Sequence, residues 1–264
     1  MTDAVTRPRD ARYVITCVLV GLAAGLLSGL FGVGGGTVIV PLLVLVLGMD
    51  QRLAAGTSLG AIVPTATVGV ISYAVHDSVA WIPALILALG AVVGAQIGTW
   101  LLPRIPLTAL RWGFVGFLGI VIVSLFLVVP SRAADLPLTV VTVIGLIVLG
   151  LITGVLAGLL GVGGGVVVVP VLMLLFGASD LIAKGTSLLM MIPTAVSGTI
   201  GNIRRHNVDL VAAALVGLAA CTTTALGAWI ATVVDPFTGN ILFAAFLVVI
   251  AVQMALKAIR GRRR

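Results

Sequence analysis

The sequence contains no glutamate and has few charged residues of any kind. Of its 264 residues only 9% are charged, whereas about 25% are charged in an average soluble domain, and 61% are hydrophobic. So few charges cannot cover the surface of a soluble globule of this size. The composition therefore excludes a soluble enzyme, a disordered chain and a nucleic-acid-binding module, and it favours an integral membrane protein.

Residues that support catalysis or bind cofactors are also scarce. All eight acidic residues are aspartates, and we expect none of them deep inside an apolar segment, so the sequence offers no proton relay and no cage for a cation. Cys17 and Cys221 lie in apolar runs without a Cys/His cluster, which predicts no metal and no redox cofactor. The sequence has no GxxxxGK[ST] loop, GxSxG elbow or HExxH pair. We therefore expect a protein that is not an enzyme and that binds no cofactor.

Ten hydrophobic segments account for most of the chain. Two of them are too short for a full crossing, which needs about 20 apolar residues, and each follows a glycine cluster, so we expect half-helices there. Short polar connectors separate the segments, among them MDQR at 49–52 and SD at 179–180. The predicted segments are 13–31, 33–48, 56–75, 79–102, 111–129, 138–160, 162–176, 185–203, 210–233 and 237–258.

The second half of the chain repeats the first. The run GVGGG at 32–36 returns 129 residues later at 161–165, and the same offset relates GTSL at 56–59 to GTSL at 185–188 without a gap. Five segments in each half make the halves opposite in orientation, which is an inverted repeat. The predicted organisation is an N-terminal tail (1–12), a first repeat (13–129), a linker (130–137), a second repeat (138–258) and a basic tail (259–264).

The positive charges support a multi-pass plasma-membrane topology with both termini in the cytoplasm. If all ten segments cross, thirteen of the fifteen lysines and arginines lie on the cytoplasmic side, as the positive-inside rule requires. One alternative stays open, because the first two segments of each half could form a re-entrant hairpin. Removing two crossings leaves every later loop on the same side, so counting charges does not separate the two cases.

The repeated glycines predict a site for an anion. Consecutive glycines are poor helix formers, and a break inside the bilayer leaves backbone N–H groups at the positive end of the helix that follows. The alternative is close packing of helices through small residues. The threonine and serine of each GTS could cap a helix start or donate to the anion. The predicted substrate-binding residues are Gly34, Gly35, Gly36, Thr57, Ser58, Gly163, Gly164, Gly165, Thr186 and Ser187.

Four prolines within segments form two repeat pairs, Pro41 with Pro170 and Pro64 with Pro193. Proline removes a backbone hydrogen bond and kinks a helix, so these residues are candidate hinges for alternating access or simple packing kinks. His76, Lys184 and His206 fall near predicted segment ends, where we expect interfacial side chains that reach toward the headgroups.

The two stretches LLSGLFGVGGGTVIVPLLVLVLG with GTSLGAIVPTA, and GVLAGLLGVGGGVVVVPVLMLLFG with GTSLLMMIPTA, resemble the TauE/SafE family of sulfite exporters. The resemblance covers nearly the whole chain outside the tails. It implies an all-helical polytopic transporter of small anions such as sulfite, organosulfonates or other organic anions. The family's paired motifs fall on residues 32–36 with Pro41 and 56–58, and on residues 161–165 with Pro170 and 185–187.

The leading hypothesis is therefore a transporter that exports a small sulfur oxyanion or organic anion by alternating access between two inverted halves. The alternatives are an anion channel, and a membrane scaffold or assembly factor for a partner enzyme. The expected partners are the anion itself and membrane lipid, with which the RGRRR tail would interact, and no nucleic acid. The sequence leaves the substrate, the energy coupling and any homo-oligomer undetermined.

Overall fold

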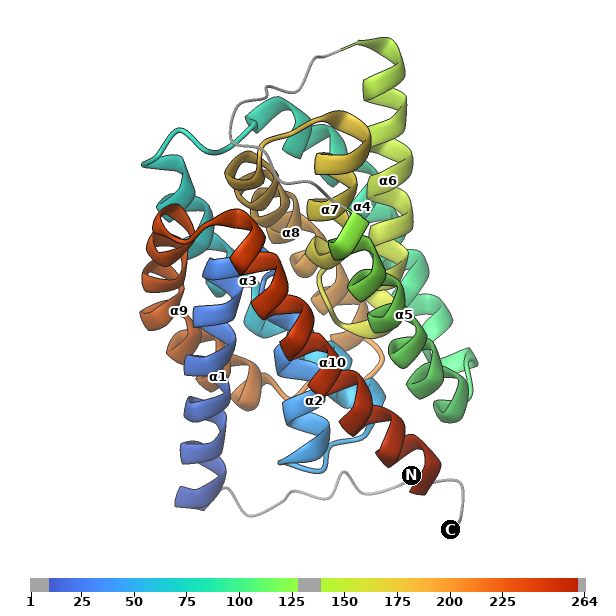
Figure 1. Cartoon of the computed structure of the whole chain (residues 1–264). Helices are drawn as coiled ribbons and strands as arrows, with labels where there is room; N and C mark the ends of the chain where they lie inside the picture. The colour runs from blue at the N-terminus through green and yellow to red at the C-terminus, as the bar shows by residue number, and fades with distance from the viewer. Residues whose placement is uncertain (1–9, 128–138, 261–264) are drawn as a thin grey trace.

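The computed structural model describes residues 10–127 and 139–260, and within those ranges every regular element is helical (Figure 1). The all-helical prediction is confirmed, and each of the ten predicted segments corresponds to one α-helix. The elements are α1 (Ala11–Phe31), α2 (Gly36–Leu45), α3 (Gln51–Ala74), α4 (Trp81–Leu101), the 3-10 turn η1 (Leu102–Arg104), α5 (Leu107–Leu127), α6 (Val140–Leu160), α7 (Gly165–Phe176), α8 (Asp180–Ile203), α9 (Leu210–Val233) and α10 (Pro236–Arg260).

Within the described residues, six helices have the length and hydropathy of membrane spans, namely α1, α3, α4 continued by η1, α6, α8 and α9. The helices α2 and α7 have 10 and 12 residues. At 1.5 Å per residue they reach about 15 and 18 Å, roughly half of a hydrocarbon core of about 30 Å. These lengths favour the re-entrant hairpin over ten full crossings.

The two hairpins enter the molecule from opposite ends. Figure 1 shows α1 rising from the end where both chain termini lie and α2 turning back toward that end, whereas α6 descends from the far end and α7 turns back toward it. The turns of both hairpins therefore lie in the interior, between the ends of the molecule.

Helices of the two halves are interleaved rather than packed as separate bodies. The helix α1 packs along α9, α4 packs along α6, and α3 packs against both α8 and α9. The repeat makes α1 the counterpart of α6 and α4 the counterpart of α9, so exchanging the halves converts the first contact into the second. The contacts of α3 with α8 and of α5 with α10 each join a helix to its own counterpart. The repeats are thus units of sequence, and the packed unit is the whole chain.

Small residues bring the paired helices into backbone contact. Gly90, Gly94 and Gly98 of α4 face the backbone of α6, and a Cβ at Gly94 would overlap the carbonyl oxygen of Leu151. This is the close packing through small residues that the sequence offered as an alternative for its glycines. It operates along α4 and α6, and also at glycines of the two GVGGG motifs, since a Cβ at Gly161 would lie 2.4 Å from the carbonyl oxygen of Ala55.

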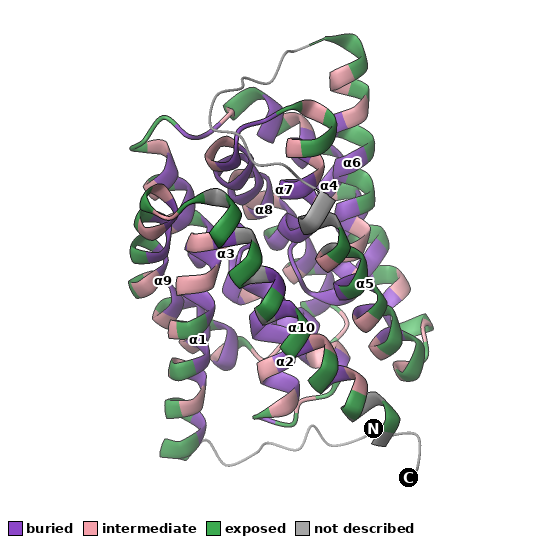
Figure 2. Ribbon diagram, in the orientation of Figure 1, coloured by how far each residue is buried: buried purple, intermediate pink, exposed green. Residues whose placement is uncertain are grey.

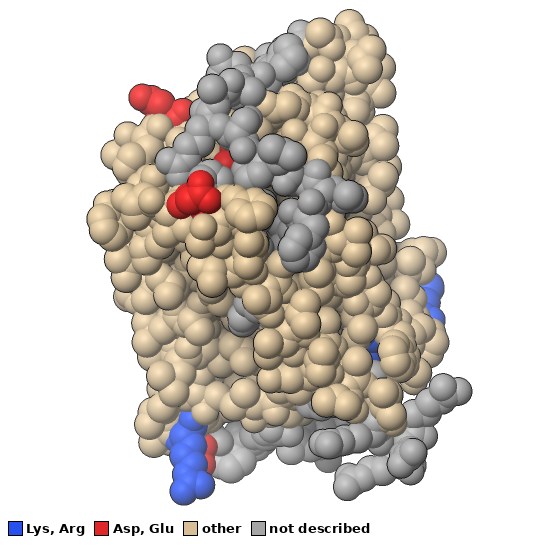
Figure 3. Space-filling view, in the orientation of Figure 1, with Lys and Arg blue, Asp and Glu red and all other residues tan. Residues whose placement is uncertain are grey.

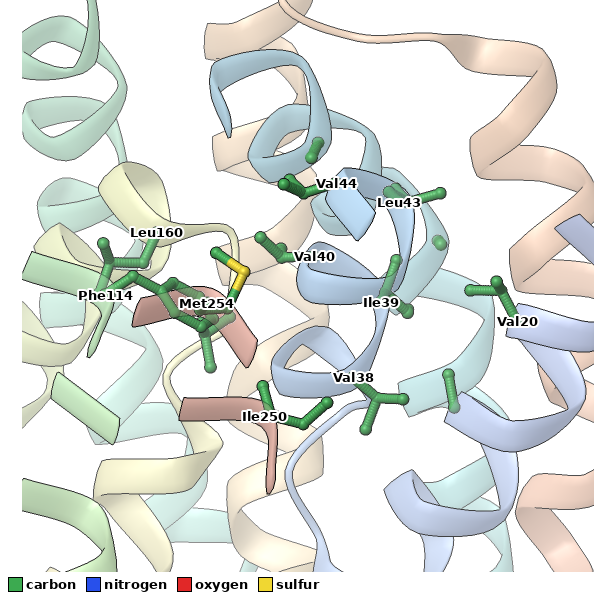
Figure 4. Close-up of a cluster of buried hydrophobic side chains, with 14 of the residues drawn as sticks. Val20, Val38, Ile39, Val40, Leu43, Val44, Phe114, Leu160, Ile250 and Met254 are labelled. Carbon is green, nitrogen blue, oxygen red and sulfur yellow. The ribbon is translucent and has the colours of Figure 1, made fainter. Parts of the chain in front are cut away.

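The short helix α2 is apolar on all sides and is enclosed by longer helices. Figure 4 shows its side chains between those of α1 on one side and of α5, α6 and α10 on the other. A helix that is apolar all round belongs in the interior, and the purple colour of α2 in Figure 2 agrees. The labelled buried residues are Val20, Val38, Ile39, Val40, Leu43, Val44, Phe114, Leu160, Ile250 and Met254.

The outer face of the bundle is also apolar. Leu89 on α4 and Leu218 on α9 are 67% and 66% exposed on this face. A water-soluble bundle would bury most large apolar side chains of this kind in its interior. Figure 3 shows few charged side chains on this face: acidic ones lie toward the upper left, and basic ones lie at the lower left, beside another acidic group, and along the right edge below the middle. Such an apolar face is what a lipid-facing surface requires, and the chain is a multi-pass membrane protein.

Three helices begin four or five residues before their predicted starts, one of them α5, which begins at Leu107 rather than at 111. The helices α3 and α8 begin at Gln51 and Asp180, five residues before the predicted positions. The polar connectors explain the difference, because Asp50 accepts hydrogen bonds from the N–H groups at the start of α3 and Ser179 does the same for Ile182. The predicted linker 130–137, residues 1–9 of the N-terminal tail and residues 261–264 of the basic tail lie outside the described residues.

Candidate functional site

The first glycine motif breaks the chain between α1 and α2. Gly32 ends α1 with φ +68°, and Gly34 and Gly35 have φ values of +68° and +78° before α2 begins at Gly36. These angles lie in the left-handed region that glycine adopts without steric cost. The second motif, 161–165, has the same pattern between α6 and α7. The predicted helix breaks are therefore present in both halves.

The two motifs lie against each other. A Cβ at Gly36 would lie 2.7 Å from the carbonyl oxygen of Gly161, and one at Gly165 would lie 2.9 Å from the carbonyl oxygen of Gly32. Ser58 of α3 donates a buried hydrogen bond of 2.8 Å to that same Gly161 oxygen. The structure thus brings the predicted glycines of both halves together, with one predicted serine at the point where they meet.

The starts of α2 and α7 have no side-chain caps. Their N-cap residues are Gly35 and Gly164, whose carbonyl oxygens accept from the third and fourth residues of each helix. A glycine has no side chain to satisfy the first N–H groups of the helix, and those groups form the positive end of the helix dipole. Two buried helix starts of this kind have the chemistry of an anion site.

Two apolar side chains fill the space between the motifs. A Cβ at Gly34 or at Gly163 would overlap Cε of Met191, and Ile62 lies 3.3 and 3.1 Å from the same two positions. Ile62 and Met191 are repeat counterparts, so each half contributes one of them. In this conformation the glycine motifs face apolar side chains, and an anion reaching them would have to displace these groups.

The two threonines of the predicted site accept hydrogen bonds from the starts of two other helices. Thr57 accepts a hydrogen bond of 3.0 Å from the N–H of Asp209, and Thr186 accepts one of 3.0 Å from the N–H of Ala80. Asp209 and Ala80 are the N-cap residues of α9 and α4. The threonines lie inside α3 and α8, so the expectation that they cap their own helix starts is wrong. They instead hold in place the starts of helices in the opposite half, α9 for Thr57 and α4 for Thr186.

The remaining predicted serine, Ser187, stays with the glycines. Its Oγ would lie 2.8 Å from a Cβ at Gly165, and its hydroxyl donates to the sulfur of Met191 at 3.9 Å. The four candidate hinges, Pro41, Pro64, Pro170 and Pro193, all lie within helices.

Sequence reasoning missed a buried ion pair. Asp180 and Lys184 occupy successive turns at the start of α8, with Nζ of Lys184 2.9 and 3.0 Å from the two carboxylate oxygens. Both residues are buried. The expectation that Lys184 is an interfacial side chain is therefore wrong, whereas Asp180, although buried, is the first residue of α8 and does not lie deep inside an apolar segment. The sequence did contain a signal for this pair, because Asp180 and Lys184 are four residues apart directly after Ser179, the N-cap of α8. His76 and His206, by contrast, are exposed near helix ends as predicted.

Within the described residues, no three histidine, cysteine or aspartate side chains gather where they could hold a metal ion, and Cys17 and Cys221 are unpaired. The polar groups near the glycine motifs that could contact a ligand are therefore backbone N–H groups, hydroxyls and one buried ion pair.

Comparisons with known proteins agree with this description. The family model for sulfite exporter TauE/SafE matches residues 3–125 and 146–264. Two relatives from Bacillus subtilis, the probable membrane transporter proteins YdhB and YunE, are each 30% identical to this chain. The match with YdhB covers 74% of this chain and 80% of YdhB. The match with YunE covers 77% of this chain and 83% of YunE. A probable membrane transporter protein of Haemophilus influenzae is 29% identical over 93% of this chain and 99% of its own. No solved structure matches the chain significantly.

Proposed function

The chain belongs to the sulfite exporter TauE/SafE family of membrane transporters, and on that premise we propose that it carries a small anion across the plasma membrane. The observation that carries this proposal is the meeting of two uncapped helix starts at the paired glycine motifs. Each start directs backbone N–H groups and a positive dipole end into the same buried region.

The proposed substrate is a sulfur oxyanion such as sulfite, or an organosulfonate or other organic anion. Backbone N–H groups and the hydroxyls of Ser58 and Ser187 are donors, which suits oxygen-rich anions of either kind. The proposed direction is export. An inside-negative potential favours outward movement of an anion by about 2.3 kcal/mol per charge per 100 mV, so export needs no further coupling ion.

The proposed mechanism is alternating access between inverted halves. The interleaved helix contacts and the opposite entry of the α1–α2 and α6–α7 hairpins support it. Ile62 and Met191 lie two residues before Pro64 and Pro193 in α3 and α8. A bend at either proline would move the apolar side chain that faces the glycines, so we assign these prolines the role of hinges.

We also propose that both termini are cytoplasmic. The arginines at 52, 104, 111, 204 and 205 belong to the side that the positive-inside rule assigns to the cytoplasm, together with both tails.

Flux from proteoliposomes loaded with sulfite, sulfate, thiosulfate, sulfoacetate or simple carboxylates tests the function. We expect protein-dependent, saturable flux of one class, with counter-transport. Non-saturable flux would indicate a channel. Absence of flux for every anion, from protein shown to be helical and monodisperse, would contradict transport and favour a scaffold.

Gly35→Leu and Gly164→Leu test the site, because each places a side chain at an N-cap of the paired helices. We expect at least a tenfold loss of flux from either variant. Gly113→Leu is the matched control, since nothing lies within 4 Å of its Cβ position on α5. Folded Gly35→Leu and Gly164→Leu proteins that transport at the wild-type rate would show that the site lies elsewhere.

A further inference from the structure

The two halves differ at the glycine motifs. Around the first motif the chain has Ser28 on α1 and Thr37 on α2, whereas their repeat counterparts beside the second motif are Ala157 and Val166. The second motif has Thr153 beside Gly164 where the first has Ala24 beside Gly35, but the Thr153 hydroxyl donates to the carbonyl oxygens of Leu149 and Gly150.

Ser28 and Thr37 are fully buried, and neither hydroxyl has a hydrogen-bond partner among the described residues. Ser28 lies one turn before Gly32 and accepts that residue's N–H through its carbonyl oxygen, and Thr37 is the second residue of α2. A buried hydroxyl without a partner is costly, so its retention beside a helix start points to a ligand that is absent here.

The buried ion pair lies at the same place. A Cβ at Gly32 would be 2.5 Å from Cβ and 2.7 Å from Cγ of Lys184, so the lysine packs directly on the end of α1. The counterpart contact in the other half is between Gly161 and Ala55. Asp180 likewise corresponds to an uncharged residue, Gln51. Of the two motifs, only the first therefore has the aliphatic stem of a lysine packed on it, with the ammonium held by Asp180.

The same helix turn has a further polar contact. Tyr73 of α3 is buried and donates a hydrogen bond of 2.7 Å to the carbonyl oxygen of Gly29. This bond satisfies a carbonyl near the end of α1, where an exposed negative dipole end would oppose an anion.

We propose that the anion binds at the first glycine motif, with Lys184 as its positive charge and the hydroxyls of Ser28 and Thr37 as donors. Asp180 holds the ammonium when the site is empty, and the anion competes with it for Lys184. This assignment rests on the proposed function and makes the second motif a structural partner. A buried ion pair is poor at stabilising a fold, because desolvation offsets the attraction, so its presence in one half alone is explained by a ligand.

The double variant Asp180→Gln with Lys184→Ala tests the assignment. It gives α8 the residues that α3 has at the equivalent positions, and it removes both charges together, so no unpaired charge stays buried. We expect a folded protein whose KM for the anion rises at least tenfold. Asp180→Asn alone frees the ammonium, so we expect a lower KM with slower turnover. A purely structural pair would change thermal stability and leave KM unchanged in both variants.

Ser28→Ala and Thr37→Val provide a second measurement that does not depend on the ion pair. Each should raise KM several-fold. Thr199→Val is the matched control, because the Thr199 hydroxyl is also buried without a partner but lies fifteen residues beyond Lys184 on α8, about 22 Å along the helix.

The outcomes separate the two proposals. Wild-type protein that transports no anion overturns the proposed function. Wild-type protein that transports an anion, together with unchanged KM in the double variant and in both hydroxyl variants, overturns only the assignment to the first motif.

Discussion

Ser58 of α3 donates a hydrogen bond of 2.8 Å to the carbonyl oxygen of Gly161, which joins the centre of one half to the glycine motif of the other. Its counterpart Ser187 has a weaker partner, the sulfur of Met191 at 3.9 Å. The same sequence, GTS, thus serves two different contacts at the centre of the molecule.

This difference predicts unequal effects of removing the two hydroxyls. Ser58→Ala should lower the free energy of unfolding by about 0.5–1.5 kcal/mol, because a buried carbonyl loses its donor. Ser187→Ala should cost less. Thermal unfolding in detergent measures both, and equal losses would contradict the asymmetry.

The two threonines should behave alike. Thr57→Val and Thr186→Val keep the side-chain shape but remove the acceptor for the N–H at the start of α9 or α4. Each should cost about 0.5–1.5 kcal/mol of stability while KM for the transported anion stays within twofold. A large rise in KM without a loss of stability would instead identify the threonines as substrate ligands.

The contact between α4 and α6 should tolerate no added methyl group. In Gly94→Ala the new Cβ would overlap the Leu151 carbonyl oxygen and lie 2.8 Å from the N atom of Val155, so we expect a loss of about 1–3 kcal/mol. Gly113→Ala adds the same group to open space on α5 and should be neutral or stabilising. Similar unfolding temperatures for the two variants would show that the helices are not in backbone contact.

Met191 should limit access to the glycines. Met191→Ala removes the group that lies between Gly34 and Gly163, so we expect faster flux and weaker discrimination among anions. Met254→Ala on α10 is the matched control, because Met254 is equally buried but packs near Phe114 and Leu160 around α2. Equal flux and equal selectivity in the two variants would contradict this prediction.

The proposed inversion of the two halves makes a topological prediction. Val75 and Arg204 are repeat counterparts at the ends of α3 and α8, and both are exposed. In a background with Cys17→Ala and Cys221→Ala, a membrane-impermeant thiol reagent should label Val75→Cys from outside the cell and Arg204→Cys only from the cytoplasmic side. Labelling of both from one side would rule out inversion.

The positions of the helices and of their breaks could be predicted from local sequence patterns. Apolar runs bounded by polar connectors located each helix to within a few residues, because the bilayer dictates hydrophobic length locally. The breaks at residues 32–36 and 161–165 followed from glycine, since the φ values found there depend on the residue itself and little on its surroundings.

Only the tertiary structure decided which residues face one another. In a membrane helix the lipid-facing and the buried sides are both apolar: Leu87 and Leu89 of α4 are fully buried and 67% exposed, respectively, yet they are the same residue type. Hydrophobic periodicity therefore did not indicate which side of α8 contacts α1. That contact places Lys184 on Gly32 and buries Asp180 with it, which depends on packing between residues about 150 positions apart.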